Sequence, residues 1–196
     1  MQTPECSGES IERDLYRRRL RGAAEGIEYI IPRIKDYLEI LEAVEMIFER
    51  SAGAVLFYRD LVIEYLLLRY GAGHWDFPKG EIEPGEGELE TVRREVWEET
   101  GIRDIEIIPG FRKKIHYYYR KSGQLVRKTV VFYLARAPTK EVTLSYEHTG
   151  YIWLDYENAL RKLTFKTARE TLREAHEFLI HTYNLRHSLK RLDDWR

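Results

Sequence analysis

The chain has 196 residues, enough for one domain of ordinary size with a further segment. Its 43% hydrophobic and 33% charged residues are typical of a globular protein, and no apolar run approaches the ~20 residues of a membrane span. A formal net charge of -1 excludes a broadly basic surface for nucleic acid or membrane. Cys6 is the single cysteine, and the polar first ten residues do not resemble a secretion signal, so a cytoplasmic location is expected.

Glutamine and asparagine are scarce in this chain, with Gln at positions 2 and 124 and Asn at 158 and 184, while Glu, Arg and Lys are abundant. Few thermolabile amides and many ion-pairing side chains favour a thermophile protein. Ordinary variation in a charged sequence is the alternative explanation.

Residues 1–44 are predicted to form a helical extension. Ser10 is a suitable N-cap, and Ile34, Leu38 and Leu41 recur at helical spacing. The helix that carries Ile34, Leu38 and Leu41 could pack on the core or form a dimer contact. Monomer and homodimer are therefore both possible. A basic run could contact RNA or an acidic partner, although a solvated charged face explains it more simply; it consists of Arg13, Arg17, Arg18, Arg19 and Arg21.

From residue 45 to 196 the pattern predicts one domain of strands and helices. Two strands, 52–58 and 61–69, are expected around a turn at Arg59–Asp60. Proline and glycine residues from 78 to 87 indicate a loop. A helix is predicted over 88–100, ended by Gly101 and burying Leu89, Val92 and Val96.

Further strands are expected near 105–108, 112–119, 126–135 and 150–154, with Ser122–Gly123 as a turn. The last segment, 165–183, is predicted to be a helix whose buried face carries Ala168, Leu172, Ala175 and Leu179. Strands flanked by helices indicate an α/β (α+β) fold, a layered α/β/α sandwich around a mixed β-sheet.

Three glutamates share one face of the helix predicted over 88–100. Glu95, Glu98 and Glu99 are spaced i, i+3 and i+4, where like charges repel. The negative end of the helix dipole adds to this cost, so a compensating cation is expected. Neighbouring arginines could supply part of the charge, and a divalent metal, which prefers carboxylate oxygens, could supply more. An ion-paired, solvated helix face is the alternative that spacing alone leaves open.

The whole segment resembles the Nudix box. Gly80, Glu86, Arg94-Glu95-Val96, Glu98-Glu99 and Gly101-Ile102 stand at the spacing of that motif. A match at seven fixed positions by chance is on the order of 10⁻⁷. The resemblance implies a Nudix-type fold with a loop–helix–loop catalytic motif, and hydrolysis of a nucleoside diphosphate linked to another group.

The resemblance also implies a cofactor, Mg²⁺ or Mn²⁺, and roles for individual residues. Glu95, Glu98 and Glu99 correspond to metal ligands, as does the main-chain carbonyl of Lys79. Arg94 corresponds to the arginine that orients the neighbouring glutamate. The ion would lower the pKa of water and neutralise phosphate oxygens, and one glutamate would act as general base. We favour Glu99 as that base, with Glu95 as the alternative.

Outside the box the chain resembles asymmetrical diadenosine-tetraphosphate hydrolases over about residues 50–180. His74 and Lys79, in the run His-Trp-Asp-Phe-Pro-Lys-Gly, correspond to residues that contact the phosphate chain. Tyr117 corresponds to an aromatic residue that stacks on adenine, and Lys128 to a lysine that binds phosphate. Tyr118 and Tyr119 stand beside Tyr117 and alternate between the two faces of the strand, so a one-residue error in the register would change the residue that has the first role.

Two further correspondences lie beyond these strands. Glu147, in Ser-Tyr-Glu-His-Thr-Gly-Tyr-Ile-Trp-Leu, corresponds to a metal ligand from a distant loop. Phe165 corresponds to a second base-stacking aromatic, although anchoring of a helix explains it equally well. Tyr151 and Trp153 are expected to be core residues.

Three functions are compatible with these residues. The favoured one is asymmetric cleavage of diadenosine tetraphosphate, a small nucleotide, to ATP and AMP. Trp75, Phe77 and Pro78 also resemble bacterial RNA pyrophosphohydrolases, so RNA 5′ ends are a second, less favoured substrate. A nucleotide-binding regulator without catalysis is the third, and the complete set of charged residues argues against it.

Overall fold

The computed structural model describes residue 18 and residues 46–193, with side chains up to residue 182. The predicted extension over 1–44, with its basic run, lies outside the described residues apart from Arg18, which is exposed. The chain divides into a larger unit, residues 50–116 and 129–196, and a smaller unit, residues 1–49 and 117–128.

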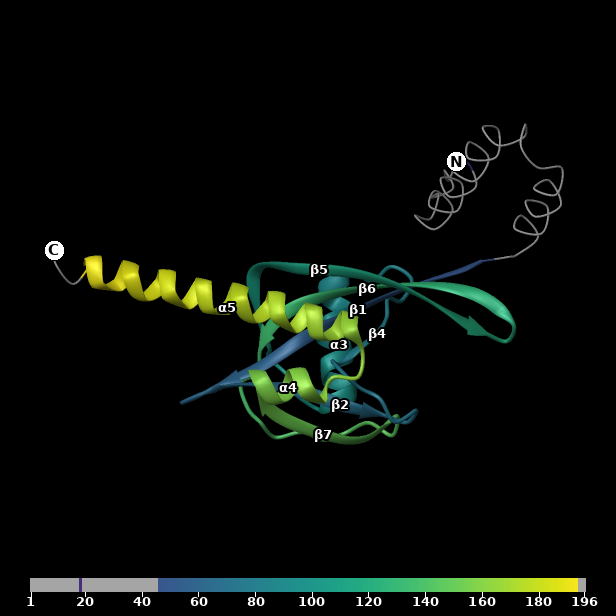
Figure 1. Cartoon of the computed structure of the whole chain (residues 1–196), viewed down its shortest axis with the longest axis horizontal. Coiled ribbons are helices and arrows are strands. Elements are labelled where there is room, and N and C mark those ends of the chain that lie inside the picture. Colours follow the sequence, from purple (N-terminus) through teal and green to yellow (C-terminus); the bar gives the residue numbers. More distant parts are fainter. Residues whose placement is uncertain (1–17, 19–45, 194–196) are drawn as a thin grey trace. The chain divides into compact units, whose positions relative to one another are not determined.

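In the described part of the chain, one sheet contains seven strands, and three helices lie between and after these strands in sequence (Figure 1). The strands are β1 Ile47–Arg59, β2 Ile63–Tyr70, β3 Trp75–Asp76, β4 Lys79–Glu81, β5 Glu106–Lys121, β6 Gln124–Arg136 and β7 His148–Asp155. The helices are α3 Glu88–Thr100, α4 Tyr156–Lys162 and α5 Lys166–Asp193. The order in the sheet is β3-β2-β1-β6-β5, with β4 paired to β1 and β7 to β2.

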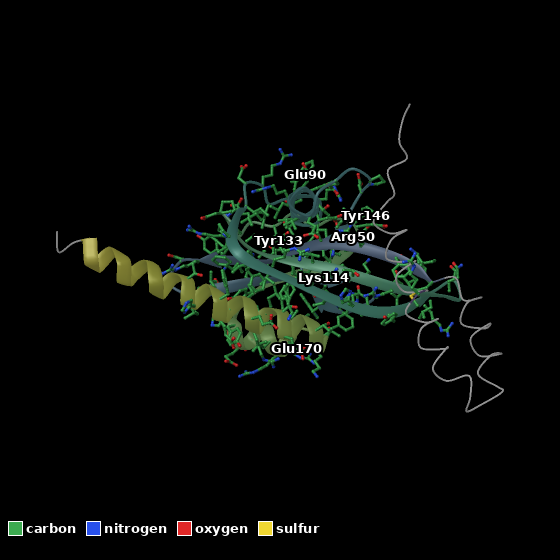
Figure 2. All side chains as sticks on the ribbon, turned by 90° about the horizontal axis from the view of Figure 1, so that it is seen from above. Arg50, Glu90, Lys114, Tyr133, Tyr146 and Glu170 are labelled. Carbon is green, nitrogen blue, oxygen red and sulfur yellow. The ribbon has the colours of Figure 1, made fainter. Side chains whose placement is uncertain are left out.

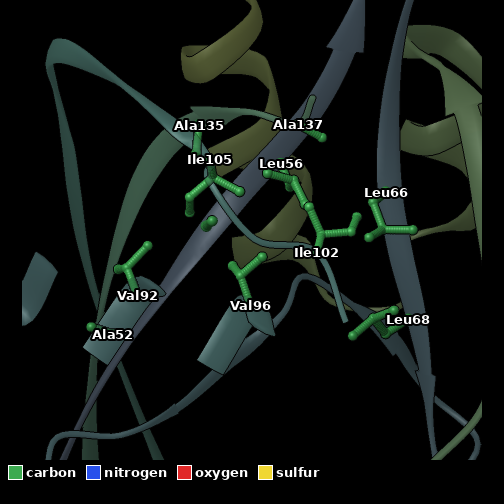
Figure 3. Close-up of a cluster of buried hydrophobic side chains, with 11 residues drawn as sticks. Ala52, Leu56, Leu66, Leu68, Val92, Val96, Ile102, Ile105, Ala135 and Ala137 are labelled. Carbon is green, nitrogen blue, oxygen red and sulfur yellow. The ribbon is translucent and has the colours of Figure 1, made fainter. Parts of the chain in front are cut away.

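Helices cover both faces of the sheet in the larger unit. Figure 2 shows α3, marked by Glu90, on one side of the strands and α5, marked by Glu170, on the other. Leu66 of β2 packs in one cluster with Val92 and Val96 of α3 (Figure 3), whereas the hydroxyl of its neighbour Tyr65 lies 2.8 Å from Nδ1 of His176 on α5. Successive strand residues point to opposite faces, so the layered α/β/α arrangement predicted from the sequence is confirmed.

The cluster beneath α3 contains only small and aliphatic buried side chains. It comprises Ala52, Ala54, Leu56, Leu66, Leu68, Val92, Val96, Ile102, Ile105, Ala135 and Ala137. The alanines of β1 leave room for the helix to approach the sheet closely. This packing fixes which face of α3 is turned away from the core, and the charged residues of the helix lie there except Glu99, which is buried.

The predicted ends of α3 and the buried face of α5 are confirmed. Gly101 ends α3 in the left-handed conformation, with φ 72°, and its N–H donates to the carbonyl of Trp97. The four predicted residues of α5 are buried: Ala168, Leu172, Ala175 and Leu179. Ser122 and Gly123 both have positive φ, as the tight turn between β5 and β6 requires.

Several predicted details were wrong. Leu89 is exposed, because the core side of α3 is formed by residues further along the helix. The turn after β1 lies at residues 60–62, with Leu61 in solvent. The expected loop over 78–87 includes strand β4, and the two strands expected over 105–119 are one strand that passes through Gly110 at φ 95°. Tyr151 is exposed, while Trp153 packs against the core cluster as expected.

None of the helices in the described part of the chain is long and apolar enough to cross a membrane.

Candidate active site

The predicted site residues of the larger unit come from five places in the chain. Four of these places are α3, β4, the turn that leads to β3 and the segment before β7, and Phe165 adds a fifth between α4 and α5. Strand β4 pairs with β1, so that Gly80 lies opposite Ala52, whose buried side chain belongs to the core cluster under α3. The pairing therefore places the backbone of residues 79–81 against the charged face of the helix.

Gly80 allows the closest of these approaches. A Cβ atom at this position would overlap the carboxylate of Glu95. No other residue type would fit without displacing that side chain, since every other amino acid carries a Cβ. The glycine of the motif is thus explained by the contact between strand and helix.

Arg94 holds the acidic side chains of this region in place. Its Nη1 donates to Glu95 at 2.7 Å and to Glu98 at 3.0 Å, while Nε and Nη2 donate to the two carboxylate oxygens of Glu86 at 2.9 and 2.8 Å. Nη2 also donates to the carbonyl of Glu81. Hydrogen bonds from this guanidinium lower the pKa of Glu86 to about 2. The arginine therefore binds a charged network rather than one partner.

Glu99 is the most deeply buried carboxylate of the group. Its Oε2 accepts a hydrogen bond from the backbone N–H of Lys79 at 2.9 Å. Burial raises the pKa of Glu99 to about 8; the negative charges of Glu95 and Glu147 act in the same direction, and the charge of Lys79 opposes them. Burial likewise raises the pKa of Glu95. Like charges at a buried point indicate a position where a cation would be stabilising.

In the described residues, no three side chains of His, Cys, Asp or Glu already converge as a finished metal site. Two of the glutamates, Glu95 and Glu98, pair with Arg94. The donor chemistry nevertheless fits a hard divalent ion. Carboxylates of Glu95, Glu98, Glu99 and Glu147 and a main-chain carbonyl are all oxygen donors.

The side chains of His74 and Lys79 both contact the ring of Tyr70. The ring of His74 stacks on Tyr70, with centroids 4.7 Å apart, and Lys79 Nζ lies 4.1 Å from the centroid of the same ring. Lys79 Nζ also pairs with Asp76 at 3.1 Å. Burial, and secondarily the charge of Lys79, lower the pKa of His74.

Phe165 is brought to His74 from 91 positions away in sequence. The ring centroids are 5.1 Å apart, and the phenyl ring is 45% exposed. An aromatic residue that anchors a helix would be covered, so its exposed ring is free to contact a ligand. The structure thus brings together two of the predicted substrate-binding side chains.

The remaining two predicted substrate-binding residues, Tyr117 and Lys128, belong to the smaller unit. Lys128 Nζ lies 3.3 Å from Glu49, which also accepts hydrogen bonds from Tyr119 at 2.6 Å and from Lys121 at 2.9 Å. The Tyr117 and Tyr119 rings are 6.3 Å apart. Lys128 is therefore engaged with a carboxylate, an ion pair that the sequence did not suggest.

Sequence reasoning missed three residues that shape this region: Tyr70, Asp76 and His148. His148 is buried, its Nδ1 lies 2.9 Å from Ser145 Oγ, and its ring meets Tyr70 edge to face. The contact of Tyr70 with His148 joins segments distant in sequence, so local spacing carried no signal for it. The pairs His148–Ser145 and Asp76–Lys79 are each three residues apart, and they stand in the runs quoted from the sequence around Glu147 and Lys79.

Comparison with known proteins shows which family this chain belongs to. The model of the NUDIX domain matches residues 42–175. The chain is 41% identical over 146 residues to the bis(5′-nucleosyl)-tetraphosphatase (asymmetrical) of Mus musculus, covering 68% of this chain and 97% of that protein. The corresponding protein of Sus scrofa is 40% identical over 143 residues, covering 66% and 95%.

A solved structure agrees with these relatives. The structure of a C. elegans Ap4A hydrolase binary complex superimposes with a TM-score of 0.61 at 29% identity, covering 68% of this chain and 98% of that one. The match extends over nearly the whole length of each relative and includes the helix with the clustered glutamates. The chain belongs to the Nudix family of hydrolases.

Proposed function

We propose that this protein hydrolyses dinucleoside polyphosphates with Mg²⁺ or Mn²⁺, and cleaves diadenosine tetraphosphate asymmetrically to ATP and AMP. The observation that carries the proposal is the buried carboxylate of Glu99, whose pKa is raised to about 8 beside Glu95 and Glu147. The names of the relatives, asymmetrical bis(5′-nucleosyl)-tetraphosphatases, support the substrate.

The metal would be held by oxygen donors of this cluster. We assign Glu95, Glu98, Glu99, Glu147 and the carbonyl of Lys79 to it. When bound, the ion would neutralise the charge of phosphate oxygens and lower the pKa of a water molecule bound to it. Glu98 is half exposed and shared with Arg94, so it can turn away from the guanidinium at little cost.

Glu99 is our candidate for the general base, and Glu95 is the alternative. The backbone N–H of Lys79 holds Oε2 of Glu99, which leaves Oε1 to take the proton from the attacking water. Arg94 would keep Glu95 in place through the 2.7 Å hydrogen bond. Its role is positioning, because its donors are directed at carboxylates and a carbonyl of the protein.

Substrate contacts are assigned to the residues around Tyr70. Lys79 would exchange its pair with Asp76 for a phosphate oxygen, and His74 would donate a hydrogen bond to the phosphate chain. The exposed ring of Phe165 would stack on a base, a contact that contributes about 1–3 kcal/mol. We assign a second base contact to Tyr117 and a phosphate contact to Lys128.

Product analysis tests this proposal. The full-length chain is incubated with diadenosine tetraphosphate and Mg²⁺, and the nucleotides are separated by ion-exchange chromatography. Equal amounts of ATP and AMP are expected, with no turnover in EDTA. Formation of ADP as the sole product would contradict asymmetric cleavage, and absence of turnover with either metal would contradict the activity.

A further inference from the structure

A cavity of about 340 Å³ lies between α3 and the residues that follow it, Ile102–Ile105. Its volume is within the range of small-molecule sites in proteins. The floor is apolar, and the polar part of the lining is dominated by arginine, with Asp104 as the one acidic residue. A cavity with this charge balance favours an anionic ligand over a neutral or cationic one.

Two of the arginines present free donors to the cavity. The guanidinium carbon of Arg103 lies 4.4 Å from the centroid of the Trp97 ring. Stacking uses the face of the guanidinium, whereas its five N–H donors lie in the plane and remain available. Arg93 is anchored by the hydrogen bond from Nη1 to the carbonyl of Ile105 at 2.8 Å. This bond leaves the N–H groups of Nε and Nη2 to donate to a ligand.

Neither arginine forms an ion pair with a carboxylate among the residues that the structure describes. Arg94, which also lines the cavity, differs from them because Glu86, Glu95 and Glu98 accept its hydrogen bonds. Arg93 and Arg103 are thus held in position by uncharged partners, a ring and a carbonyl. Two positioned guanidinium groups at one cavity match the geometry of a phosphate group, which accepts paired N–H donors.

Trp97 adds an apolar surface to this pair. It stands on α3 between the glutamates of the cluster, and 44% of its surface is exposed. A large exposed aromatic residue beside free cations is suited to a ligand that combines an anion with a flat ring.

We propose that this cavity binds a nucleoside polyphosphate at a second site, with Arg93 and Arg103 on the phosphate and Trp97 against the base. The site differs from the carboxylate cluster in the sign of its charge, so it would bind the nucleotide without a divalent ion. Arg94 lines this cavity and also donates hydrogen bonds to the glutamates of the carboxylate cluster. The proposal stands independently of the assigned hydrolytic activity.

Tryptophan fluorescence of the full-length protein during titration with ATP in EDTA tests the proposal. A saturable change is expected in the parent protein and in Glu99→Gln, because neither hydrolysis nor a metal is required. The variant Trp97→Phe should lose the signal, since Trp97 is the one tryptophan among the residues that line the cavity. Inorganic tripolyphosphate should compete with ATP, and adenosine alone should not.

The decisive comparison uses two double variants. Arg93→Gln with Arg103→Gln should weaken ATP binding at least tenfold and reduce its dependence on salt concentration. Arg161→Gln with Arg173→Gln changes two exposed arginines on α4 and α5 and should leave binding as it is. Equal affinity in both double variants, or an unchanged signal in Trp97→Phe, would overturn the proposal.

Discussion

Nε2 of His148 lies 3.5 Å from Oε1 of Glu99, and both side chains are buried. Burial lowers the pKa of His148 and raises that of Glu99 to about 8. The two groups are therefore neutral at pH 7 in the absence of metal, rather than an ion pair. Among the described residues, His148 Nε2 has no hydrogen-bond partner, so a buried polar atom is left unsatisfied beside the carboxylate cluster.

The first prediction concerns the free energy of unfolding, which ionisation of the buried Glu99 lowers. As pH rises from about 4.5 to 8, the unfolded chain loses a proton that the folded chain keeps, so the free energy of unfolding falls. Glu99→Gln removes this titration and should be the more stable protein in EDTA above pH 8, by on the order of a few kcal/mol. The difference should vanish below pH 4.5.

Urea unfolding of both proteins at pH 4, 7 and 9 measures this effect. Glu174→Gln is the matched control, because Glu174 is exposed on α5 and pairs with Lys113. A Glu99→Gln protein that is less stable than the parent at pH 9 would show that the carboxylate is not strained.

The second prediction concerns the contact between β4 and α3. Gly80→Ala places a methyl group where the Glu95 carboxylate lies, so that carboxylate must move. Since small displacements of catalytic groups are costly, kcat/KM should fall about 100-fold. Gly150→Ala is the control, because a Cβ there meets nothing closer than 3.9 Å. Equal activity of the two variants would refute the role of this contact.

The third prediction concerns the smaller unit. Hydrogen bonds from Tyr119 and Lys121 and the charge of Lys128 outweigh burial and lower the pKa of Glu49 to about 2. The ionised group therefore stabilises the fold above pH 4.5, and this contribution is lost as pH falls towards 2. Glu49→Gln should reduce stability at pH 7 by about 1–2 kcal/mol.

Thermal unfolding between pH 7 and pH 2 provides the measurement. The two proteins should differ most at pH 7 and converge near pH 2. A constant difference across this range would mean that the charge of Glu49 is unimportant.

The fourth prediction concerns the face of the sheet covered by α5. Leu172 is fully buried, so Leu172→Ala should destabilise the protein by roughly 2–5 kcal/mol through lost contacts and a cavity. Leu61→Ala, at a side chain 96% exposed, should change stability by less than about 0.5 kcal/mol. Denaturant titration of both variants distinguishes these values, and similar losses would contradict the packing.

Features set by local spacing could be predicted from the sequence. The helix α3, its end at Gly101 and the shared face of Glu95, Glu98 and Glu99 depend on residues within one or two turns of each other. The buried face of α5 follows from the same periodicity. Leu89 fits that period as well, but only the packing of the sheet decides where the covered part of a helix begins.

Features set by pairing between distant segments could not be predicted. Strand β4 is extended because Gly80 pairs with Ala52, and its proline- and glycine-rich surroundings indicated only a loop. The contact of His74 with Phe165 and that of Lys128 with Glu49 join segments far apart in the chain. Pro109 and Gly110 suggested a break in β5, whereas a glycine at positive φ lets one strand continue.

We propose that the buried carboxylate of Glu99 acts as the general base in hydrolysis that uses a divalent ion. The most direct measurement is the kcat of Glu99→Gln for diadenosine tetraphosphate in Mg²⁺, beside Glu174→Gln and the parent protein, each shown to be folded. We predict a loss of roughly 10²–10⁴-fold for Glu99→Gln and parental activity for Glu174→Gln. Parental turnover by Glu99→Gln would contradict the account.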